Sequence, residues 1–446
     1  KAEPSLRARR TGCADLPLHR GTVPPWLAER MKNLGTLIVE SIIQNYGKRE
    51  VLVRLSDPMW FQSFGAVLGM DWHSSGITTS VMYALKRGLN ERGRELGICV
   101  CGGRGKYSRN TPNELLFLSD AAGLDGASLV RASRLCAKVD NNAVQDGFQL
   151  YQHNFIVTDE GDWAVVQQGM NAASRTARRY HWCSPKLRSF VEEPHTGVVG
   201  EKRDEILNLT DRAAQRTRAA IVEIAHENPD RIVHELSHIA SPSAAIVVPR
   251  EPELFPDLAE SADKTAETVC PSPAPHSNDV AKTARISHSS RSITMSTHHD
   301  VRAEDIDLKR LGAVLALSYE SPPEDFESLL LTPGLGPRTL QSLALVSEIV
   351  YGTPSRFTDP ARFSFAHGGK DGHPFPVPCR IYDETIRVLG DGIEKSKLGD
   401  TDKTECLRRL YVTQLQIERF CSPEADFDKA VAYEKAHSKS WDGKRV

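Results

Sequence analysis

Three aspartates in the first half of the chain are the residues best suited to hold a divalent cation. Carboxylate oxygens are the ligands that Mg²⁺ and Mn²⁺ prefer, and such ions activate water and offset phosphate charge during hydrolysis. The candidate metal ligands are Asp71, Asp140 and Asp146. The sequence therefore predicts a metal-dependent phosphodiesterase or nuclease site that uses Mg²⁺ or Mn²⁺.

Basic side chains near these aspartates supply the other groups that the reaction needs. A histidine can orient or deprotonate the attacking water, and a lysine can offset charge that builds on the phosphate. We assign His73 to the water and Lys106 to the phosphate, with His153 as a further catalytic candidate. Taken singly, the acidic residues also suit helix caps and turns, as Asp71 and Asp146 do. The set as a whole favours a catalytic or ligand site.

A predicted helical corner at residues 326–344 is the second feature with chemical potential. Apolar residues recur at helical spacing on both sides of a Pro-Gly-Leu-Gly turn, so two short helices would share one apolar seam. Gly334 and Gly336 permit positive φ and a close approach by another backbone. Arg338 and Thr339 follow at the start of the second helix, where free amides attract anions. The corner therefore predicts a helix-hairpin-helix that binds DNA backbone phosphates, with a packing corner as the alternative.

Two glycine-rich basic loops are further candidates for phosphate contacts. Residues 102–109 follow a predicted strand, but they fail the Walker A and GxGxxG patterns, so ATP hydrolysis is not supported. A flexible loop without a ligand is the alternative there. Residues 367–373 follow the corner and carry Lys370, which we expect to contact a phosphate.

One further pattern imitates a zinc site. Residues 234–238 satisfy H-E-x-x-H on a predicted helix, which would place two imidazoles on one helix face. That helix is expected to end at Ser241–Pro242, before any third ligand. A solvated helix face is the preferred interpretation.

Composition limits the class of protein. Lysine and arginine total 56 against 58 acidic residues, so any contact with nucleic acid must be local. The 9 cysteines are scattered, which favours reduced thiols in an intracellular protein. No apolar run of about 18 residues is present, so no membrane-spanning helix is expected. We expect a cytoplasmic protein, associated with the nucleoid if prokaryotic.

The 446 residues are enough for two or three domains. Helices and strands alternate over residues 1–240, which predicts a mixed α/β domain that holds the catalytic site. Residues 241–293 are rich in Pro, Ser and His and predict a disordered linker. Residues 294–446 predict a mainly α-helical domain with the DNA-binding corner. The expected class is α+β.

Five motifs, in this order, resemble an uncharacterised prokaryotic family catalogued as domain of unknown function 763. They are residues 11–21 (TGCADLPLHRG), 71–76 (DWHSSG), 145–151 (QDGFQLY), 178–182 (RRYHW) and 363–372 (FSFAHGGKDG). The resemblance covers nearly the whole chain. It implies the same fold boundaries and the DNA-binding corner, but it implies no reaction.

The sequence thus predicts a protein of DNA repair or processing, with a metal-dependent nuclease site and a helix-hairpin-helix that grips the DNA backbone. Two alternatives stay open. A DNA glycosylase or lyase could use the same corner, with Lys370 or Asp371 near a flipped base. A non-enzymatic protein that binds DNA structures would show affinity without turnover.

Overall fold

The computed structural model of the chain describes residues 16–17, 23–70, 76–200, 205–240, 308–361, 377–418 and 421–422. Among the candidate site residues, Asp71, His73 and Lys370 lie outside these ranges, as does the predicted 241–293 linker. Within the described ranges, no helix is both long and apolar enough to cross a membrane.

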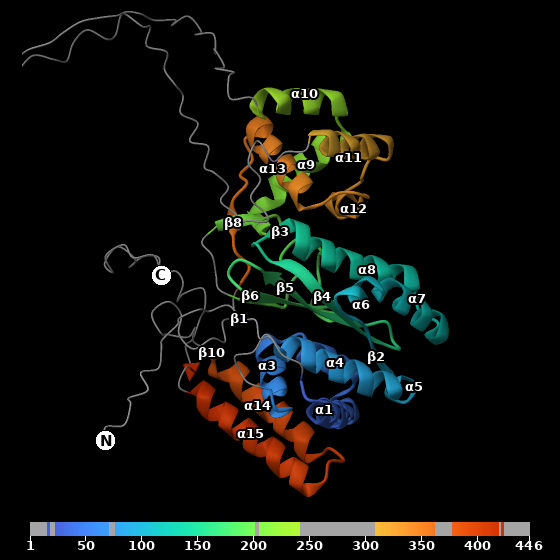
Figure 1. Cartoon of the computed structure of the whole chain (residues 1–446), viewed down its shortest axis with the longest axis vertical. Coiled ribbons are helices and arrows are strands. Elements are labelled where there is room, and N and C mark those ends of the chain that lie inside the picture. Colours follow the sequence, from blue (N-terminus) through green and yellow to red (C-terminus); the bar gives the residue numbers. More distant parts are fainter. Residues whose placement is uncertain are drawn as a thin grey trace, which may run out of the picture.

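A six-stranded sheet forms the centre of the molecule (Figure 1). Its order is β1 (Leu16–Pro17), β6 (Thr176–Cys183), β5 (Trp163–Asn171), β4 (Gln149–Thr158) and β2 (Ile98–Arg104), and β7 (Gly197–Val199) also pairs with β6. All of these pairings are antiparallel. Strand-like residues 148–157 and 163–168 around a turn at residues 159–162 predict a hairpin, and β4 and β5 form it. Strand β6 is a finding of the structure, because arginine, tyrosine and histidine seldom fill a buried strand.

Helices cover both faces of this sheet (Figure 1). One face packs against α1 (Pro25–Tyr46), α2 (Lys48–Leu55), α3 (Pro58–Val67), α4 (Gly76–Glu91) and α5 (Gly93–Leu96). The other packs against α7 (Thr111–Ala122), α8 (Gly126–Lys138), the π-helix η1 (Val139–Ala143) and α9 (Gln215–His226), while α6 (Lys106–Arg109) contacts β2 and β4.

The alternation of side chains along β4 explains why the sheet has two cores. Phe155 and Val157 point into one apolar cluster, and Ile156 between them points into the other. Both faces are therefore buried, so residues 155–157 of the strand form a continuous apolar run. Apolar residues at helical spacing over residues 26–46 predict an amphipathic helix that stops at Gly47, and α1 follows this pattern, with Leu34 and Ile38 buried.

The predicted C-terminal region is divided between the two sides of the sheet (Figure 1). On the α8 side lie α11 (Leu308–Glu320), α12 (Phe326–Leu331) and α13 (Pro337–Tyr351), and α11 contacts α10 (Pro229–Ala240) from before the 241–293 segment. On the α1 side lie α14 (Cys379–Glu394) and α15 (Asp400–Glu418). Between them, β9 (Phe357–Thr358) pairs with β8 (Glu205–Asn208), which pairs with β3 (Val144–Gln145). The predicted α+β class is confirmed, with helices dominating the C-terminal region.

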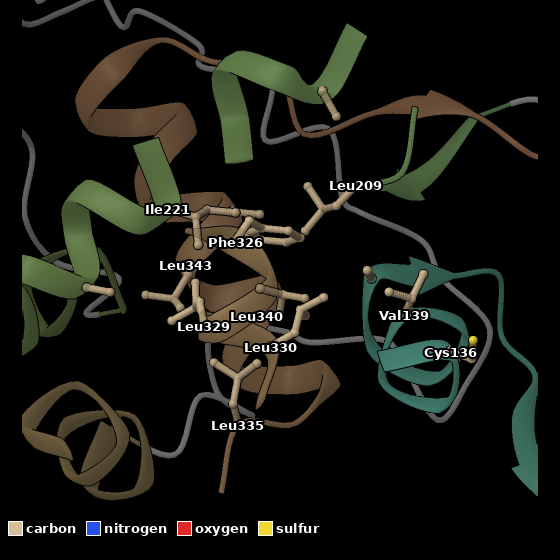
Figure 2. Packing of buried hydrophobic residues seen from close by; sticks show 14 of the residues in the cluster. Cys136, Val139, Leu209, Ile221, Phe326, Leu329, Leu330, Leu335, Leu340 and Leu343 are labelled. Carbon is tan, nitrogen blue, oxygen red and sulfur yellow. The ribbon is translucent and has the colours of Figure 1, made fainter. Parts of the chain in front are cut away.

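The predicted corner is present as two helices, α12 and α13, joined by residues 332–336. Figure 2 shows their shared seam, which includes Leu329, Leu330 and Leu343 together with Ile221 from α9. Asp325 caps α12 by accepting from the Ser328 amide at 2.8 Å. The helical geometry is therefore as predicted, whereas its use as a DNA-binding motif is still a prediction.

Candidate functional site

Polar side chains occupy both faces of the central sheet at one end. Antiparallel pairing places His153, Gln167 and Tyr180 in one row, and Gln152, Gln168 and Arg179 in the neighbouring row on the opposite face. All six are buried. We call these two rows the polar end of the sheet.

Asp140 lies beside the first row, on η1, and each of its oxygens has a protein partner. Its Oδ1 is 2.5 Å from Nε2 of His195. Its Oδ2 accepts from Trp182 Nε1 at 2.9 Å and from the amide of Gln167. The carboxylate is completely buried. It therefore orients His195, whose Nδ1 has no hydrogen-bond partner among the residues described.

The protonation of His153 follows from its neighbours. Gln167 donates through Nε2 to Cys136 O at 2.9 Å, so its Oε1 must be the acceptor for His153 Nδ1–H at 2.7 Å. His153 Nε2 then accepts from the Ser133 hydroxyl at 2.9 Å. Burial also lowers the pKa of His153. The lowered pKa favours the neutral imidazole, and both of its nitrogens have hydrogen-bond partners.

Asp146 belongs to a second buried network. Its Oδ1 accepts from the Phe148 amide at 3.0 Å, which is the turn predicted as the structural alternative. Its Oδ2 accepts from Arg178 at 3.0 Å and from the Tyr180 hydroxyl at 2.6 Å. Arg178 also pairs with Asp359 at 3.0 Å. Burial raises the pKa of Asp146, while Arg178 and Tyr180 oppose that rise.

Arg179 has a different environment from its neighbour. Its guanidinium donates to Gln62 Oε1 at 2.9 Å, to Thr78 Oγ1 at 3.3 Å and to His181 Nε2 at 2.8 Å. His181 must then carry its proton on Nδ1, which donates to Leu55 O at 3.1 Å. All three acceptors are neutral, and burial lowers the pKa of Arg179 to about 9. Thr78 lies in the first turn of α4, close in sequence to Asp71 and His73.

Lys106 is the first residue of α6 and is exposed at the rim of the polar end. Arg104, the last residue of β2, pairs with Gln152, and α6 begins two residues later. A Cβ at Gly102 would lie 2.2 Å from His153 O, so this glycine lets β2 approach β4 closely. The structure thus brings Lys106, His153, Asp140 and Asp146 to one end of the sheet.

The corner is attached to the same region. Lys138 Nζ donates to Leu335 O at 2.8 Å, and Asn142 Nδ2 donates to the same oxygen at 3.3 Å. Gln145 Nε2 donates to Pro337 O at 2.8 Å. Lys138, Asn142 and Gln145 come from the segment 138–146, which also carries both described aspartates.

The two glycines of the corner have different backbones. Gly334 has φ of 82° and is exposed, as predicted, whereas Gly336 is the N-cap of α13 in an extended conformation. Arg338 is exposed and Thr339 is only 6% exposed. Of the two predicted phosphate-binding side chains, Arg338 is therefore the one that faces solvent.

The described residues give the predicted metal no ready site. Every oxygen of Asp140 and Asp146 accepts from a protein donor. Within the described ranges, no group of three or more His, Cys, Asp or Glu side chains is placed to hold an ion. Because Asp71 and His73 lie outside those ranges, the metal site is still a prediction.

Several residues at the polar end were not found from the sequence alone. His195, Arg178, Tyr180 and Asp359 have no periodicity that separates them from loop or surface residues. The one available signal is the arginine pair at 178–179 between aromatic and apolar residues, since a charged pair inside a strand needs buried partners.

The buried histidines predict a loss of stability in mild acid. Burial lowers the pKa of His153 and of His181, so below the unfolded value of about 6.5 the unfolded chain binds more protons. As the pH drops from about 7.5 to about 5.5, the free energy of unfolding should fall by at most about 1.4 kcal/mol per pH unit for each histidine. Urea titrations measure it. His153→Gln should reduce the slope, and an identical slope would contradict the assignment.

Comparison with known proteins identifies the family. The model of the family described as "Protein of unknown function (DUF763)" matches residues 12–377. Neither the curated proteins nor the solved structures yield a match. Because the matched range covers well over half of the sequence, the chain belongs to this family.

Proposed function

We propose that the protein binds the sugar–phosphate backbone of DNA through its corner, residues 332–339. The observation that supports this is the orientation of two peptide groups. In a trans peptide, the carbonyl and the next N–H point in opposite directions. The carbonyls of Leu335 and Pro337 accept from Lys138 and Gln145. The N–H groups of Gly336 and Arg338 therefore point away from segment 138–146.

These two amides suit an anionic oxygen. Both belong to the start of the 15-residue helix α13, where the peptide dipoles favour negative charge. Gly334 has no side chain to block a strand, and Arg338, which is exposed, adds a full positive charge at the start of the helix. The ammonium of Lys138 lies behind them, 2.8 Å from Leu335 O. A phosphate diester matches this set of donors, because it is an acceptor with one negative charge.

A second proposal is metal-dependent hydrolysis at the polar end. It is favoured by segment 138–146, which both hydrogen-bonds to the corner and carries Asp140 and Asp146. Because the corner amides point away from this segment, a DNA backbone held by them would reach the polar end only by continuing past the corner. The described carboxylates act in this proposal by orienting other groups, as Asp140 does for His195. Metal binding would fall to Asp71, with His73 beside it.

The glycosylase or lyase alternative gains no support from the described residues. Its candidate residues, Lys370 and Asp371, lie outside them. The other alternative, a protein that binds DNA without cleaving it, is consistent with the first proposal.

Charge reversal at the corner tests the first proposal. Arg338→Glu should weaken binding to fluorescein-labelled duplex DNA about tenfold or more, because it removes a charge-assisted contact. The slope of log K against log salt should also fall by about one. Fluorescence anisotropy over a series of salt concentrations measures both.

Arg94→Glu is the matched control, since Arg94 is exposed on α5, far from the corner (Figure 1). An unchanged affinity and salt slope in Arg338→Glu would contradict the proposal. Equal weakening in both variants would show only a general effect of net charge.

Cleavage assays test the second proposal. Labelled DNA should be cut with Mg²⁺ or Mn²⁺ and left intact with a chelator. Asp71→Ala should abolish cutting while the affinity for DNA measured with chelator stays unchanged, because binding occurs at the corner. Asp383→Ala, at an exposed position on α14, is the control. Cutting by Asp71→Ala at the rate of the unaltered protein would remove Asp71 from the site.

A further inference from the structure

We infer that the loop at the end of β2 is a binding site for single-stranded DNA, separate from the corner. We call Arg104, Lys106, Tyr107 and Arg109 the basic–aromatic loop. The inference rests on the proposed function, because it assumes that DNA is the polyanion that the protein binds. It adds that the DNA is single-stranded where it meets this loop, and it names the residues that distinguish a single strand from a duplex.

The loop is held firmly against the sheet. Gly105 N–H donates to Tyr151 O at 2.7 Å, and the Ser108 hydroxyl donates back to Gly105 O at 2.7 Å. The short helix α6 continues directly into α7, where Thr111 donates to Ser108 O at 2.8 Å. The four side chains of the loop therefore project from a fixed backbone. A fixed backbone reduces the entropy lost when a ligand binds.

Three positive charges in this loop have no acidic partner in the part of the chain that the structure describes. Arg104, Lys106 and Arg109 are exposed, and none forms an ion pair with a described carboxylate. The acid nearest in sequence, Glu114, is already paired with Lys86 at 2.7 Å. In a chain whose formal net charge is −2, three unpaired cations within six residues make a local positive surface. Such a surface attracts a phosphate backbone.

Tyr107 supplies an exposed aromatic face among these charges. It is 57% exposed, and the Lys106 ammonium lies 5.4 Å from its ring centroid. An aromatic ring between cations is the arrangement that binds single strands, with bases stacked on the ring and phosphates on the cations. A duplex cannot use the ring in this way, because its base faces are already stacked inside.

The loop also connects to the polar end. The Arg104 guanidinium lies 5.7 Å from the ring centroid of Tyr151, whose hydroxyl accepts from Gln168 Nε2 at 2.5 Å. Gln168 and Arg179 are neighbours in the same row. A strand stacked on Tyr107 would therefore run along the rim of the polar end. The bound form of DNA is thus one with unpaired bases at that rim.

The test compares a short labelled oligothymidylate with a duplex of equal length by fluorescence anisotropy. Tyr107→Ala should weaken oligothymidylate binding about tenfold and leave duplex binding unchanged. Tyr107→Phe should bind like the unaltered protein, because the ring remains. Arg104→Gln with Arg109→Gln should lower the single-strand salt slope by about 1.4.

Tyr83→Ala is the matched control. Tyr83 is 58% exposed and also lies near a cation, Arg87, but on α4 at the opposite face of the sheet (Figure 1). It should leave both affinities unchanged. Thermal denaturation should show Tyr107→Ala folded as stably as the unaltered protein, because the side chain is exposed.

Each other outcome overturns the inference in a distinct way. If Tyr107→Ala has no effect while Arg338→Glu weakens binding, the loop is not the site and the proposed function stands. If Tyr107→Ala weakens duplex and single-strand binding equally, unpaired bases do not stack on the Tyr107 ring. If an oligouridylate binds more tightly than the oligothymidylate, the ligand is RNA. If the unaltered protein binds no DNA, the inference fails together with the proposed function.

Discussion

Buried charge is the constraint on which the polar end depends. A sheet covered on both faces has no solvent to hydrate ionised side chains, so each one needs partners from the protein. Arg178 meets this need with two carboxylates. Asp146 precedes the 241–293 segment, as Arg178 does, and Asp359 follows it. Asp140 meets it with donors from two strands and from His195. Distant parts of the chain are thereby fixed around one end of the sheet.

The same constraint governs the corner. Lys138 is half-buried, and burial lowers its pKa, so its ammonium needs the carbonyl of Leu335. Gln145 similarly donates to Pro337 O. Satisfying these donors turns two carbonyls inward and two amides outward. The proposed DNA contact is therefore a consequence of how segment 138–146 is buried.

Sequence reasoning succeeded where periodicity and turn chemistry act locally. The helix that ends at Gly47, the hairpin around residues 159–162 and the helices on either side of Gly334 are all present. It did not find β6, because a strand buried on both faces shows no alternation, and its polar residues resemble a surface segment. The site was only partly predictable for a related reason. The polar character of Asp140, Asp146 and His153 was recognised, but their partners come from positions that only the folded chain brings together.

The predicted domain boundaries rest on composition and stay a prediction. The segment 241–293 marks a change in composition, yet helices that follow it pack on both sides of the central sheet. Leu389 on α14 and Leu340 on α13 lie in different cores. The face of the sheet on which a helix packs depends on contacts with residues that are distant in the sequence. A change in local composition carries no information about those contacts.

Amide hydrogen exchange at the corner tests the central claim most directly. When the protein is saturated with duplex DNA, the amides of Gly336 and Arg338 should exchange more slowly, because phosphate oxygens accept from them. The amides of α5 should be unaffected. Unchanged exchange at Gly336 and Arg338 in protein that has demonstrably bound DNA would contradict the account.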